Sequence, residues 1–239
     1  MKLYAYCVAE KISPATETAL GVAGQQVQFL DVEGLIVVVS EFDGDAVGVT
    51  RENVLRHEAV VRSVLAQTTP LPFRFGTLVS SDSLRGFVAA RKKALSERLR
   101  LVHNSVEMGV KIIWQQSSNE KTVTPKPDNI GAGAAFLLTK RDELRGNEQL
   151  SAEANEIAEW LSAAVKSVVR QQNVNVQPTQ KLVFAGSYLI DQTDESDFRT
   201  AVSNLKSERP ELHFLISGPW PPYTFANIEL EFETQFGVL

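Results

Sequence analysis

The sequence predicts an α+β fold in two domains, an N-terminal α/β sandwich and a C-terminal ferredoxin-like domain with additional helices. Short apolar or alternating runs of strand length recur between long stretches of helical periodicity. The 239 residues also exceed the usual domain size of about 100 to 150 residues. A polar stretch rich in Pro, Gly, Ser and Asn separates the two halves of the chain. We therefore expect one domain over 1–116, a linker or exposed loop over 117–133, and a second domain over 134–239.

Three strands are expected at the start of the chain. Leu3 to Val8 and Gly34 to Val39 are apolar almost throughout, and Gln26 to Asp31 alternates. The last two runs are separated by Val32 and Glu33, which is the spacing of a hairpin, although Val-Glu is a poor pair for its turn.

A helix is expected from Arg51 to Gln67. Thr50 can cap its N-terminus, Glu52 places negative charge in the first turn, and Pro70 prevents continuation. Its apolar residues recur at helical spacing: Val54, Leu55, Val61, Val64 and Leu65.

The rest of the first domain alternates strand and helix. Leu71 to Thr77, reading LPFRFGT, is expected as a short strand, and Glu107 to Trp114 as another. Ser80 or Ser81 caps a helix of about Asp82 to His103 between them. This order favours helices on one face of a largely antiparallel sheet.

The second domain begins with helical sequence. Residues 134–172 are strongly helical, with an expected interruption around Gly146 and a restart capped by Ser151.

The elements that follow are two strands, a helix and a final strand. The strands are expected at Val174 to Gln177 and Lys181 to Ile190, and the helix at Asp194 to Arg209, ended by Pro210. Leu212 to Ile216 is the closing strand.

Composition narrows the class of protein. The chain is 44% hydrophobic and 22% charged, which is typical of a globular protein. A net charge of -5 with dispersed Lys and Arg argues against a nucleic-acid partner. Cys7 is the sole cysteine, so no intrachain disulfide is expected. The opening residues do not resemble a signal peptide, and no apolar run approaches the roughly 20 residues that span a bilayer. A cytoplasmic protein without membrane insertion is expected.

No catalytic constellation emerges from the residues, so we expect neither an enzyme nor a metal or cofactor site. His57, His103 and His213 show no ligand spacing, and His57 is interpreted as a helix residue near the surface. Phosphate loops, dinucleotide fingerprints and nucleophile elbows are missing. Arg74, within an apolar strand, needs a carboxylate or solvent. A structural ion pair between Arg74 and Glu107 is one interpretation, and a ligand-binding role for Arg74 is the other.

The most unusual segment runs from Gly218 to Phe225 and reads GPWPPYTF. Its prolines restrict their own φ and the residues before them, so the segment is expected to be stiff and extended. Its rings either seal the core of the second domain or remain partly exposed as an apolar interaction surface. The candidate interaction residues are Pro219, Trp220, Pro221, Pro222, Tyr223 and Phe225.

Several motifs together resemble the GvpF/GvpL family of gas vesicle proteins. In family order they read LYAYCV, HEAVV, LPFRFGT, EMGVKI, FLLTKRDEL and ISGPWPPYTF, and they extend over nearly the whole chain. The last motif is the most specific. The motifs identify the family better than they separate its F and L members, of which F is preferred.

The resemblance implies a non-enzymatic accessory or minor structural protein of the gas vesicle. It implies binding to the shell protein GvpA in a chaperone-like role, contacts with other Gvp accessory proteins, and association with the vesicle, plausibly at its gas-facing surface. A small-molecule-binding or enzymatic ferredoxin-like domain is the alternative, because such folds host many functions. A purely structural wall component is a third possibility.

Overall fold

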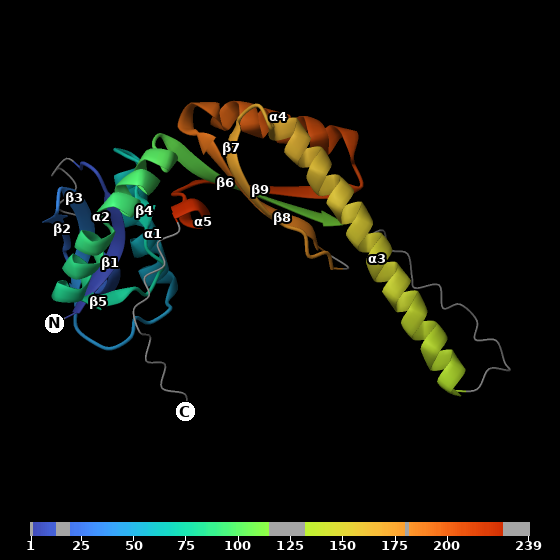
Figure 1. Cartoon of the computed structure of the whole chain (residues 1–239), viewed down its shortest axis with the longest axis horizontal. Helices are drawn as coiled ribbons and strands as arrows, with labels where there is room; N and C mark the ends of the chain where they lie inside the picture. The colour runs from blue at the N-terminus through green and yellow to red at the C-terminus, as the bar shows by residue number, and fades with distance from the viewer. Residues whose placement is uncertain (1, 13–19, 115–131, 180–181, 227–239) are drawn as a thin grey trace. The chain divides into compact units, whose positions relative to one another are not determined.

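The computed structural model describes residues 2–12, 20–114, 132–179 and 182–226 (Figure 1). The chain forms two compact units. The first unit contains Met1–Glu107 together with Pro219–Leu239, and the second contains Met108–Gly218. This division differs from the boundary that we expected after residue 116. Most of the strand that begins at Ser105 belongs to the second unit, because it pairs within that unit's sheet.

The first unit is built on a five-stranded sheet. Strands β2, β3 and β1 are neighbours in that order, and both β4 and β5 pair with the other edge of β1. All of these pairings are antiparallel. The strands are β1 (Lys2–Ala9), β2 (Val27–Val32), β3 (Leu35–Phe42), β4 (Leu71–Pro72) and β5 (Leu78–Ser80).

The β2–β3 hairpin is confirmed, but its turn lies one residue later than expected. Val32 pairs with Leu35, so Glu33 and Gly34 form the turn. Both have positive φ, 57° and 83°, as a two-residue primed turn requires. The Asp31 carboxylate accepts a hydrogen bond from the Gly34 amide at 2.9 Å. Gly34 therefore supplies the turn chemistry that Val32 and Glu33 lacked.

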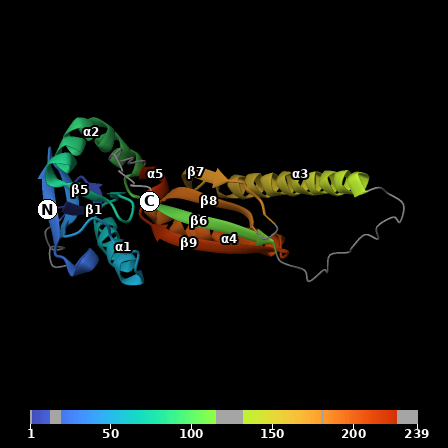
Figure 2. The same ribbon diagram turned by 90° about the horizontal axis from the view of Figure 1, so that it is seen from below.

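Helices α1 (Arg51–Leu65) and α2 (Ser81–Val102) lie on opposite sides of the first sheet (Figure 2). The expectation of helices on one face is wrong for this unit. Every residue of β1 from Leu3 to Ala9 is buried, which requires cover on both faces. The continuous apolar character of the first strand is the signal of this arrangement.

The second unit has the ferredoxin-like order of elements. Its elements follow the order β-α-β-β-α-β, and its strands are arranged β7-β8-β6-β9, which confirms the predicted ferredoxin-like arrangement. The additional α-helices expected are not found among its described residues, and its first strand was expected in the first domain. The elements are β6 (Ser105–Trp114), α3 (Ala132–Val165), β7 (Val169–Asn175), β8 (Leu182–Asp191), α4 (Glu195–Glu208) and β9 (Leu212–Trp220).

Helix α3 is continuous, so the expected interruption at Gly146 and restart at Ser151 are wrong. A glycine inside a helix costs only about 1 kcal/mol, which good helix formers on both sides can offset. Of the expected linker, residues 117–131 lie outside the described residues, and Ala132 and Gly133 belong to the helix.

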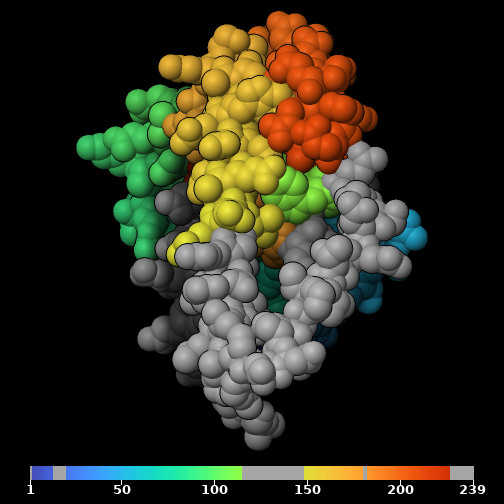
Figure 3. All heavy atoms as spheres, turned by 90° about the vertical axis from the view of Figure 1, so that its right-hand side faces the viewer, coloured from blue at the N-terminus to red at the C-terminus, as the bar shows by residue number. Residues whose placement is uncertain are grey.

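The core of the second unit lies between its sheet and helices α3 and α4, which pack side by side (Figure 3). Trp160 of α3 meets Phe214 of β9 with ring centroids 6.4 Å apart. Tyr188 of β8 meets Phe198 of α4 at 5.6 Å. Aromatic pairs from both helices thus join them to the sheet.

Candidate interaction surface

The GPWPPYTF motif packs on the first unit. Gly218 and Trp220 still belong to strand β9, and the short helix α5 (Tyr223–Ala226) follows. Residues 219–226, here called the C-terminal segment, are grouped with the first unit. The interpretation that these rings seal the core of the second domain is therefore wrong. Nothing local in the motif indicates which of two apolar cores it will join.

The rings of the C-terminal segment differ in exposure. Phe225 is buried, whereas Tyr223 is 37% exposed and Trp220 is half-buried. Pro221 and Pro222 are buried, and Pro219 is half-buried. The segment thus buries one ring fully and leaves parts of two others at the surface.

Trp220 is held by a cation from helix α1. The guanidinium carbon of Arg62 lies 5.3 Å from the centroid of the Trp220 ring. Arg62 also pairs with Glu58, one turn earlier on the helix, at 2.5 Å. A guanidinium over an indole ring is attracted by the negative face of the ring. This contact orients the half-buried tryptophan.

Glu107 binds the C-terminal segment instead of Arg74. The Thr224 amide donates to one carboxylate oxygen of Glu107 at 2.8 Å, and the Thr224 hydroxyl donates to the other at 2.6 Å. Glu107 is only 8% exposed, so these hydrogen bonds compensate a buried charge. Our sequence reasoning missed Thr224, because the two residues are 117 positions apart.

Arg74 does not form the predicted ion pair. Its side chain is exposed, and it belongs to the turn that follows β4, since only Leu71 and Pro72 of LPFRFGT form a strand. The Arg74 carbonyl accepts hydrogen bonds from the amide and hydroxyl of Thr77. No ion pair joins Arg74 to Glu107 within the part of the chain that the structure describes.

His57 is buried and joins β1 to the C-terminal segment, which corrects its interpretation as a surface residue. It is 3% exposed. Its Nδ1 lies 2.8 Å from the Tyr4 hydroxyl, and its Nε2 lies 3.1 Å from the Tyr223 hydroxyl. The Tyr4 hydroxyl also accepts a hydrogen bond from the Gly76 amide at 3.2 Å.

Burial determines the charge state of this cluster. Desolvation lowers the pKa of His57 to about 4 and raises the pKa of the Tyr4 and Tyr223 hydroxyls. Although part of Tyr223 is exposed, its hydroxyl points inward to His57. All three groups are therefore neutral at pH 7. Either tautomer of His57 donates through one nitrogen and accepts through the other, so the ring satisfies both tyrosines.

Helix α1 also carries exposed apolar side chains. Val54 is 41% and Leu55 is 50% exposed. Residues three or four apart lie on the same face of a helix. Val54 and Leu55 therefore share a face of α1 with Glu58, and Arg62 lies on that face one turn after Glu58. Arg62 contacts Trp220. We call Val54, Leu55, Trp220 and Tyr223 the α1–Trp220 surface.

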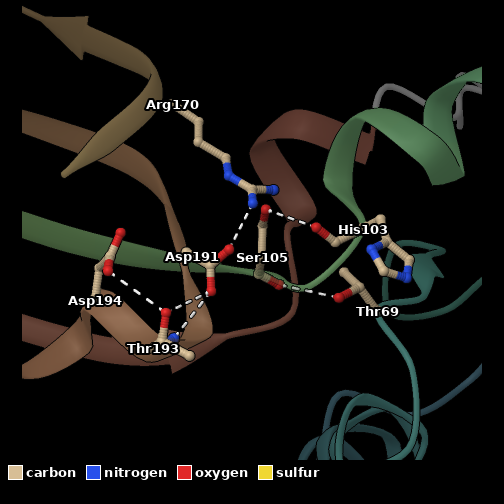
Figure 4. Close-up of polar contacts among 7 residues, drawn as sticks. All are labelled: Thr69, His103, Ser105, Arg170, Asp191, Thr193 and Asp194. Atoms are coloured by element: carbon tan, nitrogen blue, oxygen red, sulfur yellow. Dashed lines mark hydrogen bonds and ion pairs between the residues drawn. The ribbon is translucent and has the colours of Figure 1, made fainter.

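Polar contacts also stabilise connections within each unit (Figure 4). In the first unit, the Thr69 hydroxyl donates to the Ser105 carbonyl at 3.2 Å, which ties the residues before β4 to the start of β6. In the second unit, Arg170 of β7 pairs with Asp191 at the end of β8 at 2.5 Å. Asp191 also accepts from the Thr193 amide at 3.1 Å, so it terminates the strand and starts the next turn.

The described residues include no group of three or more His, Cys, Asp or Glu side chains placed to hold a metal ion. Among the helices of the described ranges, none combines the length and apolar character needed to cross a membrane.

Comparison with known proteins gives one consistent family. The family model described as gas vesicle synthesis protein GvpL/GvpF matches residues 2–227. Gas vesicle protein F1 of Halobacterium salinarum is 28% identical over 240 residues, covering 98% of this chain and 97% of that protein. Gas vesicle protein L2 of the same organism is 27% identical over 253 residues, covering 93% and 90%. The crystal structure of GvpF from Anabaena sp. PCC7120 has the same fold, with a TM-score of 0.78 at 21% identity, covering 95% of this chain and 98% of that one.

Proposed function

We propose that this chain, which belongs to the GvpL/GvpF family of gas vesicle synthesis proteins, binds the shell protein GvpA before the shell protein enters the vesicle wall. In this role it acts as a chaperone-like assembly factor in gas vesicle formation. The wall protein of a gas-filled shell needs apolar surface toward the gas, and such surface aggregates in water. A folded partner that covers it during nucleation prevents that aggregation.

The α1–Trp220 surface is the observation that carries this proposal. It combines four partly exposed apolar side chains with a cation-π contact and a hydrogen-bonded anchor beneath it. Tryptophan and tyrosine contribute strongly to interfaces when they are held in one orientation. Here Arg62 orients Trp220 and His57 orients Tyr223. An apolar partner can therefore bind without the entropic cost of ordering these rings.

The proposal also includes the destination of the protein. After delivery of GvpA it remains with the vesicle, at the gas-facing surface, and contacts other Gvp accessory proteins. The family membership supports association with gas vesicle proteins in general.

The direct experiment measures binding of co-expressed soluble GvpA to immobilised full-length protein. We compare the wild type with Leu55→Ser and with a Trp220→Ala, Tyr223→Ala double variant. Leu101→Ser is the matched control, because Leu101 is 51% exposed on α2 of the same unit but outside the surface. Circular dichroism and thermal melting verify that each variant is folded.

We expect GvpA binding by the wild type and the Leu101 variant, and at least tenfold weaker binding by the other two. Leu55→Ser is decisive, because it leaves the C-terminal segment and its anchors unchanged. Equal binding by all folded variants would place the contact elsewhere on the molecule. If the wild type itself does not retain GvpA, the assembly role through direct GvpA recognition is wrong.

A further inference from the structure

We propose that the C-terminal segment is an acid-opened strap, in which Tyr223 covers His57 and opening of the segment admits water and a proton to the imidazole. This inference concerns the chain by itself and is independent of GvpA binding.

The contacts of the C-terminal segment allow it to open as one piece. Among the described residues it is held to the first unit by the hydrogen bonds of Tyr223 to His57 and of Thr224 to Glu107, and by the contact of Arg62 with Trp220. Its buried side chains are Pro221, Pro222, Phe225 and Ala226. These contacts all lie within eight consecutive residues, so the segment can open locally without unfolding of the sheet that it covers.

The residue that precedes the C-terminal segment is held by a hydrogen bond within the second unit. Gly218, with φ of 108°, immediately precedes it. Within the second unit the Gly218 carbonyl accepts a hydrogen bond from Arg199 at 2.7 Å. Gly218 lies within β9 and tolerates a backbone conformation that other residues rarely adopt, so the chain can change direction there, before Pro221 to Ala226 leave the strand.

His57 is the group whose charge couples to opening. In the closed state its two nitrogens are occupied by Tyr4 and Tyr223, and its ring stacks on Tyr6 with centroids 5.6 Å apart. Opening removes Tyr223, which is the only one of these three that belongs to the segment. The Nε2 edge then meets water, and hydration favours the charged imidazolium.

The other groups around Tyr223 and His57 do not reverse this preference of the opened state for the charged imidazolium. Carboxylates face Tyr223 from α1 and from the start of β6, and a thiol faces it from β1. Helix α2, which also packs against α5, turns buried apolar residues inward, and β4 carries no charge. The groups concerned are Glu58, Glu107 and Cys7 around Tyr223, with Tyr4, Tyr6 and Phe75 around His57.

The size of the effect follows from proton linkage. Burial holds the pKa of His57 at about 4 in the closed state, against 6.5 for a hydrated imidazole. The proton therefore binds the open state more tightly, so the opening equilibrium rises as the pH falls below 6.5. Between pH 7.5 and pH 5 we expect the open population to increase about tenfold to thirtyfold.

The first test is an NMR titration of the His57 imidazole in the full-length protein. We expect a titration midpoint well below 6 in the wild type, and one shifted toward 6.5 in Tyr223→Ala. Tyr223→Phe is the matched control, because it retains the covering ring and loses only the hydroxyl. An unchanged midpoint in a folded Tyr223→Ala variant would overturn the proposal, since other residues would then bury His57.

The second test measures hydrogen exchange of the peptide that contains residues 219–226 at pH 7.5 and pH 5, corrected for intrinsic exchange rates. We expect a loss of protection of about tenfold or more in the wild type and none in His57→Phe, with unchanged protection in strand β8 of both. Thr224→Val should raise opening at both pH values by the same factor, because it weakens the strap without uncovering His57. Equal pH dependence in the wild type and His57→Phe would contradict the inference.

Discussion

Thr224 donates both its backbone amide and its hydroxyl to the two carboxylate oxygens of Glu107, at 2.8 and 2.6 Å. Glu107 is the last residue of the first unit before the chain enters the second, and Thr224 follows soon after the chain returns. The contact therefore joins two passages of the chain within the first unit. It explains why a unit made of two separate stretches of sequence can hold its C-terminal part.

Thr224→Val tests that contact, because valine has nearly the same shape without the hydroxyl. A hydrogen bond to a buried carboxylate contributes about 1.5 to 3 kcal/mol, so we expect the first unit to lose about 2 kcal/mol. The measurement is urea unfolding followed by hydrogen exchange in β1 and β3. Thr200→Val, at an exposed position on α4, should leave the same readout unchanged. A Thr224→Val variant as stable as the wild type would show that the amide alone satisfies Glu107.

Stability should fall on acidification because of His57. Its pKa is about 4 when folded and 6.5 when unfolded, so the unfolded state binds the proton more tightly. The contribution of the neutral, buried ring to the free energy of unfolding is fully present above pH 6.5. It is lost progressively as the pH falls toward 4, by about 3 kcal/mol in all. Urea midpoints at pH 7.5 and 4.5 measure this loss. We expect a smaller difference in His57→Phe, and the same difference in both proteins would assign the effect to other groups.

Gly21→Ala should destabilise the first unit through a steric clash, chiefly with Tyr6. A Cβ at this position would lie 2.0 Å from the Tyr6 hydroxyl oxygen, and that hydroxyl is buried and bonded to Ser40 and to the Val22 amide. Displacing it costs about 1 to 3 kcal/mol. Gly86→Ala is the opposite control, because nothing lies within 4 Å and alanine favours the helix by about 1 kcal/mol. The midpoint temperature of thermal melting should therefore fall in Gly21→Ala and rise in Gly86→Ala.

Glu33→Asn should stabilise the β2–β3 hairpin. Glu33 has φ of 57°, which asparagine adopts more easily, and Asn-Gly is the preferred pair for this turn. The exposed contact of Glu33 with Lys92, at 3.7 Å, contributes little. We expect a gain of about 0.5 kcal/mol in urea unfolding. Glu33→Ala removes the same ion pair without the favourable turn, so a gain there would refute the backbone explanation.

Local signals in the sequence were sufficient for most helices and strands. The Thr50 hydroxyl accepts from the Asn53 amide and the Ser80 hydroxyl from the Ser83 amide, as the expected N-caps require. Each cap depends on residues three positions apart, which a sequence shows directly. The second half was also predicted to be ferredoxin-like, although its first strand, β6, was expected in the first domain. The turn at Glu33 and Gly34 was missed by one residue, because apolar alternation marks strand ends less sharply than positive φ does.

The sequence by itself determined the family and the two α+β halves, because each depends on residue types at short spacing. The expectation of an extended GPWPPYTF segment is correct only as far as Trp220, since Tyr223–Ala226 form a short helix. Only the tertiary structure decided that the motif packs on the first unit, that Glu107 binds Thr224 instead of Arg74, and that His57 is buried beneath Tyr223. These contacts join residues more than 100 positions apart. They depend on which side chains the folded backbone brings together, and such pairings leave no periodicity in the sequence.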